Sequence, residues 1–234
     1  SSDELLEEII KEIARLIEEL LEILRENLER SEESLRRVLR AIDDNLRRVE
    51  RLIEALARGE KREDDVVRDV DDSNKKLEDT LREVVKENEK SNEELKRRLE
   101  EVVERVRRLL TELRKREEDE KLEDVLRLVE ELLRRLDEIL KEHEEDNKRL
   151  LDLLRDIVRR HKEEVKRALE VARRKEEPKK AMDEELEKIR RDHERLKKEI
   201  EDRLRELKDK HRRAFEELKK MLDDIKRKVD EAKR

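Results

Sequence analysis

Polar side chains recur at a fixed step of 18 residues inside an otherwise apolar helical pattern. A straight α-helix completes about five turns in that length, so residues 18 apart point the same way. Eight polar residues that interrupt the apolar pattern form four such pairs: Asn27 and Asn45, Asn74 and Asn92, His143 and His161, and His193 and His211. A step of 18 is neither the seven-residue repeat of left-handed supercoils nor the eleven-residue repeat of right-handed ones. It therefore predicts long, nearly straight helices.

The apolar positions around these pairs support the same repeat, with one competing period. Leu6, Leu24 and Ile42 are equivalent at the step of 18, as are Leu77, Leu95 and Leu113. A heptad also fits part of the first segment, which leaves a slight left-handed twist open. That heptad comprises Leu24, Leu28, Ser31, Leu35, Val38, Ile42 and Asn45.

Helix-breaking residues are almost absent, since the 234 residues include one Gly, one Pro and no Cys. A charged fraction of 59% could also signal disorder, but the periodic Leu, Ile and Val residues indicate long helices instead. Breaks at Gly59, Lys115–Lys121 and Pro178 predict helices at about residues 3–58, 62–114, 121–175 and 179–232. Short connections favour antiparallel neighbours. We expect an all-α fold with one domain over residues 1–234, a straight antiparallel up-down-up-down four-helix bundle.

Two local signals agree with these boundaries. Ser1 or Ser2 can cap the first helix, with Glu4 completing a capping box. Asp64 and Asp65 suit the first turn of the second helix, because acidic side chains are favourable at a helix N-terminus.

The polar residues align across the predicted helices. Antiparallel neighbours place two residues at one level when their residue numbers add to a constant. That sum is 119 for both Asn pairs of the first two helices, 235 between the second and third, and 354 between the third and fourth. Two levels result, Asn27, Asn92, His143 and His211 at one, and Asn45, Asn74, His161 and His193 at the other. A third level, Ile9, Leu110, Val125 and Val229, is wholly apolar.

These two polar levels predict buried hydrogen-bond networks. A buried polar group without a partner costs about 1–3 kcal/mol, so such residues must satisfy each other. Further polar residues adjoin the two levels, namely Ser31, Asn88 and Asn147 one turn from the first, and Ser73 and Ser91 beside Asn74 and Asn92. The networks specify register, because a slipped helix would bury Asn against Leu.

The chain resembles computationally designed, or de novo, helical bundles with buried hydrogen-bond networks. The resemblance lies in the strict repeats, the short connections, the lack of Cys and Trp, and polar levels between apolar ones. The stretches Arg25-Glu26-Asn27-Leu28 and Ser91-Asn92-Glu93-Glu94-Leu95 are similar to those of designed heterodimers of helical hairpins. The resemblance implies a structural scaffold, here with two hairpins joined in one chain, and no natural enzymatic activity.

The four histidines are the only candidates for chemistry, and we interpret them first as network members. A His-based metal or haem site is the alternative, although we expect no carboxylate or thiolate to share either level. A di-iron site would need Glu three residues before His, where Leu140, Val158, Arg190 and Lys208 stand. Nucleophilic catalysis needs a cleft that a filled bundle lacks. We therefore expect no enzyme, cofactor or metal.

Charge and hydropathy bear on partners and location. The net charge of −7 does not favour nucleic acid, and no apolar run approaches the length of a membrane span. With no targeting signal, we expect a soluble protein, cytoplasmic on recombinant expression. Residues 1–59 carry a net charge of −5 and residues 179–234 one of +4, which favours packing of the first helix on the fourth. We expect a monomer; open alternatives are a hairpin heterodimer after cleavage, a domain-swapped homodimer and a pH-responsive bundle.

Overall fold

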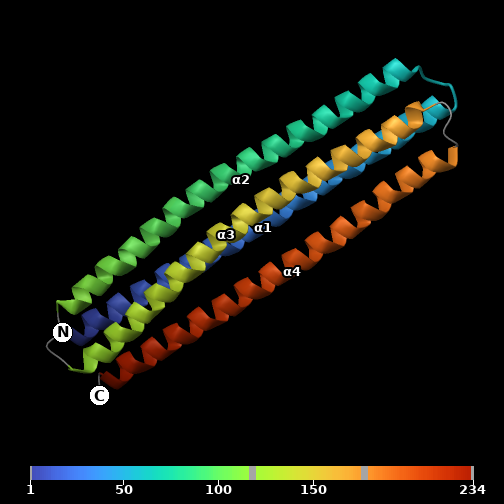
Figure 1. Cartoon of the computed structure of the whole chain (residues 1–234). Coiled ribbons are helices and arrows are strands. Elements are labelled where there is room, and N and C mark those ends of the chain that lie inside the picture. The colour runs from blue at the N-terminus through green and yellow to red at the C-terminus, as the bar shows by residue number, and fades with distance from the viewer. Residues whose placement is uncertain (1, 116–119, 175–178, 233–234) are drawn as a thin grey trace. The chain divides into compact units, whose positions relative to one another are not determined.

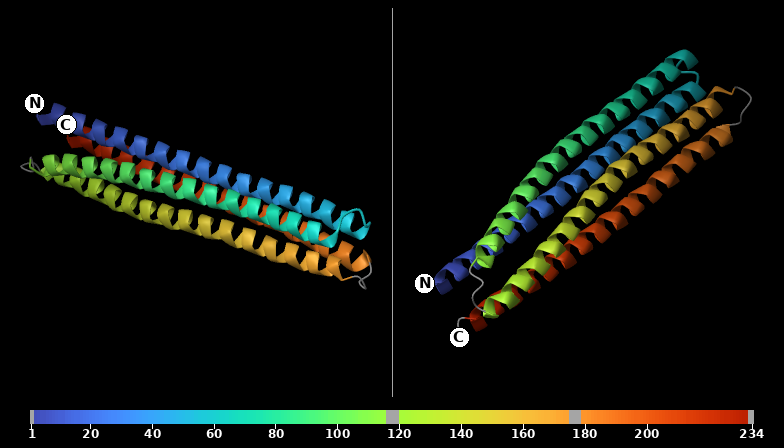
Figure 2. Two further views of the ribbon diagram at one scale, coloured as in Figure 1. Left: turned by 90° about the horizontal axis from the view of Figure 1, so that it is seen from above. Right: turned by 60° about the vertical axis from the view of Figure 1, so that its left-hand side comes forward.

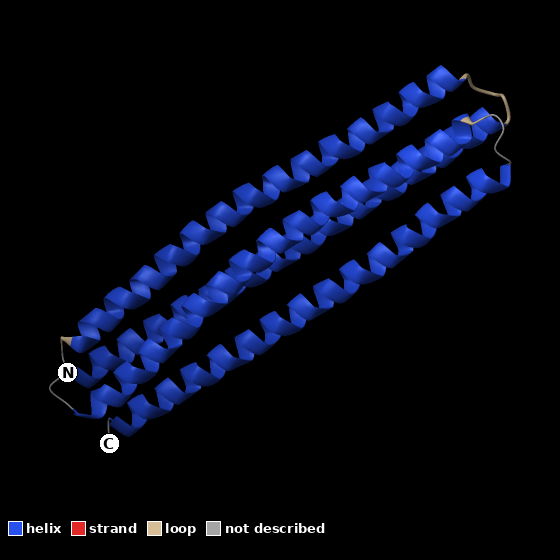
Figure 3. Ribbon diagram, viewed as in Figure 1, coloured by secondary structure: helices blue, strands red, loops and turns tan. Residues whose placement is uncertain are grey.

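A computed structural model describes residues 2–115, 120–174 and 179–232, and they form four helices without a strand. The helices are α1 (Ser2–Ala57), α2 (Glu63–Arg114), α3 (Glu120–Arg173) and α4 (Lys179–Ala232), shown in Figure 1 and coloured by structure type in Figure 3. They pack against one another as an all-α four-helix bundle, which confirms the predicted fold class. No predicted helix end differs from the structure by more than two residues. Ser1, Pro178 and part of the Lys115–Lys121 segment lie outside the described residues.

The turn between α1 and α2 forms as the single glycine predicts. Gly59 has φ of +72°, the left-handed region in which a side chain is strained. Its N–H donates to the Leu56 carbonyl at 3.1 Å, and the Glu60 N–H donates to the Ala55 carbonyl at 2.9 Å. These two bonds are those of a Schellman motif, which satisfies the last carbonyls of α1. The helix ends joined by this turn lie side by side in both views of Figure 2.

Contacts divide the bundle into two compact units. Unit 1 comprises residues 1–29, 90–147 and 206–234, and unit 2 comprises residues 30–89 and 148–205. Each contains segments of all four helices and its own apolar core, because each helix buries its Leu, Ile and Val stripe. The predicted apolar level is confirmed in unit 1, where Ile9, Leu110, Val125 and Val229 are all buried.

Ion pairs at the edges of each unit follow the antiparallel order. In unit 1, Arg107 of α2 pairs with Asp137 of α3 at 3.1 Å. In unit 2, α1 contacts α4 through Glu50 and Arg190 at 2.7 Å, as the opposite net charges of these helices predict. Exposed pairs of this kind contribute about 0–1 kcal/mol each, so they orient neighbours more than they stabilise the fold. Over the described residues, none of the helices carries an apolar run long enough to cross a lipid bilayer.

Candidate functional site: two buried polar networks

One network lies in unit 1 and is centred on the amide of Asn27; we call it network A. The Asn27 Nδ2 donates to Asn92 Oδ1 at 3.0 Å. Its Oδ1 accepts from His143 Nε2 at 2.7 Å and from Asn147 Nδ2 at 3.2 Å. A single side chain, 3% exposed, therefore joins α1 to α2 and, twice, to α3.

These bonds fix the protonation of His143 and extend network A to His211. Because Asn27 Oδ1 can only accept, His143 Nε2 must carry a hydrogen. In a neutral ring the Nδ1 of His143 is then an acceptor, and it lies 3.3 Å from His211 Nε2, which donates. The two rings meet edge to face with centroids 5.1 Å apart. All four predicted members of this level are therefore in contact through hydrogen bonds.

The same arrangement recurs in unit 2 around Asn45; we call it network B. The Asn45 Nδ2 donates to Asn74 Oδ1 at 3.1 Å and to Ser73 Oγ at 3.0 Å. Its Oδ1 accepts from His161 Nε2 at 2.9 Å. Asn45, Asn74 and His161 thus repeat the bonds of Asn27, Asn92 and His143 at the step of 18.

The fourth member of the second level departs from the prediction. His193 is buried, but its Nε2 donates to the Asp43 carboxylate of α1. Among the described residues, its Nδ1 is the one buried side-chain nitrogen or oxygen without a hydrogen-bond partner. The expectation that no carboxylate shares either level is therefore wrong for this level.

The repeat itself explains why His193 and His211 differ. The position 18 residues before Asp43 is Arg25, which lies at the surface in an ion pair with Glu22 at 2.6 Å. His211 thus has no equivalent acceptor on α1 and bonds His143 instead. Asp43 is also held by Lys197 of α4 at 3.3 Å. The charged residues at the step of 18 therefore differ between the two levels, although this difference does not by itself show that Asp43 turns inward.

His143, His161 and His211 are held in the neutral state by pKa values below the ordinary one. Burial, followed by the proximity of His211 and Lys210, lowers the pKa of His143 to about 3. Burial and nearby His193 lower the pKa of His161 to about 4, against a smaller opposing effect of Asp43. Burial also lowers the pKa of His211, which Asp146 partly counteracts. In network A the bond between the two rings also requires that one of them be neutral, since one of the two nitrogens must accept.

The remaining predicted network residues divide into bonded and peripheral ones. Asn147 joins network A, whereas the buried Asn88 donates to the Val84 carbonyl of its own helix at 3.0 Å. Ser31 is buried in unit 2. Four members are only half-buried, which corrects the expectation of fully buried levels: Ser73, Ser91, Asn92 and His211.

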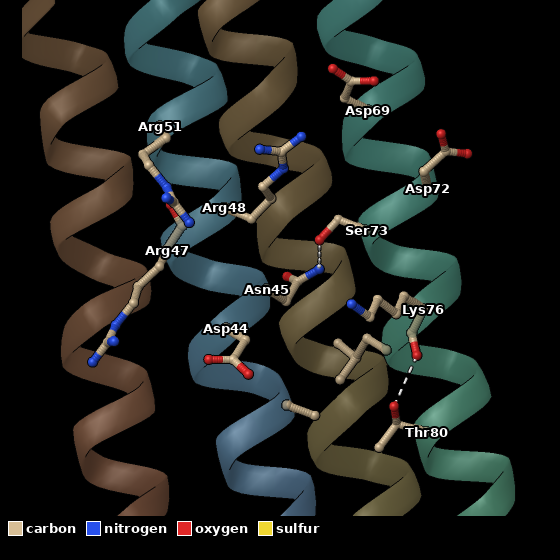
Figure 4. A pocket seen from close by; sticks show the side chains of 12 residues that line it. Asp44, Asn45, Arg47, Arg48, Arg51, Asp69, Asp72, Ser73, Lys76 and Thr80 are labelled. Carbon is tan, nitrogen blue, oxygen red and sulfur yellow. Dashed lines mark hydrogen bonds between the residues drawn. The ribbon is translucent and has the colours of Figure 1, made fainter.

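An open groove of about 590 Å³ lies beside network B, between α1 and α2 of unit 2. Figure 4 shows the Asn45 amide directed at the Ser73 hydroxyl on the groove wall, which accepts its hydrogen bond. The lining carries both signs of charge, from Asp44, Arg47, Arg48, Arg51, Asp69, Asp72 and Lys76. A mixed lining of this kind is typical of a solvated face.

A second difference between the units lies next to the histidines, at the α3–α4 contact. In unit 1, Lys210 donates to Asp146 at 3.1 Å and lies 3.4 Å from Glu142. The equivalents of Asp146 and Lys210 in unit 2 are Glu164 and Asp192, two carboxyl groups in hydrogen-bonding contact. Burial, then the bond to Asp192, raises the pKa of Glu164 to about 7. The sequence pattern does not predict this pair, because charged residues that flank an apolar stripe are ordinarily solvated.

Chemically, both networks are arrays of neutral donors and acceptors. Within the described residues, no cluster of three or more His, Asp and Glu side chains is grouped closely enough to hold a metal ion. Comparison of the chain with family models, curated proteins and solved structures gives no match.

Proposed function

We propose that the chain is a de novo designed structural scaffold in which the two networks fix helix register and the pairing of two hairpins. The hairpins are residues 1–114, which carry the Asn residues of both levels, and residues 122–234, which carry the His residues. The observation that carries the proposal is the double role of Asn27, whose amide bonds Asn92 in its own hairpin and His143 in the other.

The repetition of this arrangement supports specification of register as its purpose. Asn45 bonds Asn74 and His161 with the same atoms that Asn27 uses. A register shift would separate these partners and leave buried donors and acceptors unsatisfied, at about 1–3 kcal/mol each. Apolar levels alone would tolerate such shifts, because Leu, Ile and Val pack without direction.

The proposal is tested by cutting the chain between its hairpins. A protease site inserted between Lys115 and Lys121 should yield two fragments that stay together, since each exposes an apolar face and half of both levels. Light scattering on a sizing column should give the mass of one chain before and after cleavage. Fragments that separate, or that exchange into pairs of identical hairpins, would contradict the proposal.

A matched variant separates network specificity from apolar association. Replacing Asn27, Asn45, His143 and His161 together by Leu keeps the apolar contact but removes the central bonds of both networks. We expect its cleaved fragments to form mixed and identical pairs alike, whereas the parent fragments pair only with each other. Retention of strict pairing in this variant would show that the networks do not set it.

A further inference from the structure

The α3–α4 contacts of the two units respond to protons in opposite ways. The Asp146–Lys210 pair of unit 1 joins opposite charges, each of which favours the charged form of the other. The Glu164–Asp192 pair of unit 2 joins two carboxyl groups, which form a hydrogen bond only when they share a proton. These are the same two positions of the fold, related by the step of 18.

The histidines beside these two pairs also differ between the units in what surrounds them, and the difference again makes unit 1 the more sensitive to protons. In unit 1, the bond between His143 Nδ1 and His211 Nε2 needs one neutral ring as its acceptor, so protonation of both rings breaks it. The positive charge of Lys210 also opposes a charged His143 ring. In unit 2, the group that His193 bonds is instead the Asp43 carboxylate, so an anion and not a second ring faces this histidine.

We propose that acid destabilises unit 1 more than unit 2. In unit 1, protons break network A. In unit 2, the Glu164–Asp192 pair takes up a proton, and this offsets the weakening of network B. This inference goes beyond the scaffold proposal and does not depend on how the hairpins are paired.

Charged groups face these sites from several helices. His143 and His211 face Asp146 on α3 and Lys210 on α4, while Asn27 of α1 and Asn92 of α2 are neutral. His161 faces Asp43 of α1 and His193 of α4, and its α2 neighbours Ser73 and Asn74 reach it through Asn45. Glu164 faces Asp192, with Lys188 on α4 and Arg167 on α3 favouring its charged form.

The size and direction of each effect follow from proton linkage. A histidine with a pKa of about 3 in the folded state and about 6.5 in the unfolded state lowers the folding equilibrium roughly 30-fold between pH 7.5 and 5.0. His161 acts in the same direction in unit 2. Glu164 acts oppositely there, because its folded pKa lies above its unfolded value and the folded state gains stability as pH falls below 7. Unit 1 lacks the stability gain that Glu164 gives unit 2, so the net loss of stability on acidification falls on unit 1.

The test removes the carboxyl pair from the full-length chain and measures the pH dependence of unfolding. The variant is Asp192→Asn, and the readout is the unfolding equilibrium constant from chemical denaturation at pH 7.5 and 5.0. The matched control is Asp202→Asn on the same helix, since Asp192 and Asp202 each lie 4.0 Å from an arginine three residues on. Parent and control should lose the same stability on acidification, and Asp192→Asn should lose roughly tenfold more. Equal losses in all three chains would overturn the proposal.

A reciprocal variant and a segment-resolved measurement complete the test. Lys210→Asp places a carboxyl pair in unit 1 and should reduce the acid loss below that of the parent. Amide hydrogen exchange of the parent, corrected for the intrinsic rates at the two pH values, gives the opening of each unit and needs no variant to fold. Protection should fall more at pH 5.0 in residues 90–114 than in residues 63–89. An equal fall in the two segments, or a larger one in unit 2, would overturn the proposal.

Discussion

His193 donates from Nε2 to the Asp43 carboxylate and keeps an unpartnered Nδ1 in the core of unit 2. A buried nitrogen of this kind costs about 1–3 kcal/mol. His193→Leu removes that cost, and Asp43 keeps its ion pair with Lys197. We therefore expect the free energy of unfolding in urea at pH 7.5 to stay unchanged or to rise by about 1 kcal/mol.

The matched substitution at the other histidine should have the opposite effect. His143→Leu removes a donor to Asn27 and the acceptor of His211, in a ring that is 5% exposed. We expect a loss of about 1–3 kcal/mol in the same urea experiment. If the two Leu variants changed stability equally, the bonded and unbonded histidines would not differ in energy.

Asn27 and Asn88 offer a second comparison, between a network amide and a local one. Asn27→Leu strips partners from Asn92, His143 and Asn147, and should cost about 1–3 kcal/mol. Asn88 bonds only the Val84 carbonyl of its own helix among the contacts described above. Asn88→Leu should cost less than about 1 kcal/mol, because that carbonyl keeps its helical bond. Thermal unfolding followed by circular dichroism would rank the two, and the reverse order would contradict the network interpretation.

Much of this arrangement could be predicted from the sequence, because period and register are properties of residue order. The helix ends and the turn follow from the breaks, of which Gly59 is one, and the bonded trios around Asn27 and Asn45 follow from the step of 18 and the constant sums. The partner of His193 did not follow. Asp43 lies at the edge of the apolar stripe, where a charged residue is ordinarily solvated. Whether it turns inward depends on the side chains of α4, which no single-helix pattern contains.

The pH dependence of the whole chain follows from the neutral histidines. The pKa values of His143 and His161 are about 3 and about 4 in the folded state, below the unfolded value of about 6.5. The unfolded chain therefore binds more protons below pH 6.5, so stability is intact above that pH and falls until each folded pKa is reached. The loss is about 1.4 kcal/mol per pH unit for each such histidine.

A variant with all four histidines changed to Asn is the control for that pH dependence. Carboxylates that titrate near the lower pH are common to both chains, so their contribution cancels. The denaturation midpoint of the parent should fall more than that of the variant between pH 7.5 and pH 4.5. Equal falls would mean that the histidines are not held neutral by the fold.

The turn at Gly59 allows a test of backbone strain alone. A Cβ at this position would meet no atom within 4 Å, so Gly59→Ala creates no clash. The φ of +72° still disfavours Ala, and we expect a loss of about 1 kcal/mol in the free energy of unfolding. Gly59→Asn should recover part of it, because Asn tolerates this region better. No loss for Ala would indicate that the turn relaxes to another conformation.

The three equivalent levels of the chain, one apolar and two polar, together define the register of the helices, because the apolar level differs from the other two. If α1 slid by one full repeat, Asn45 would come to the level of His143, and the partners would still match there. Asn27 would then come to the level of Leu110, Val125 and Val229, which offers its amide no partner. The apolar level therefore makes the alignment unique. With polar levels alone, a shift of 18 residues would still satisfy the hydrogen bonds at one of the two levels.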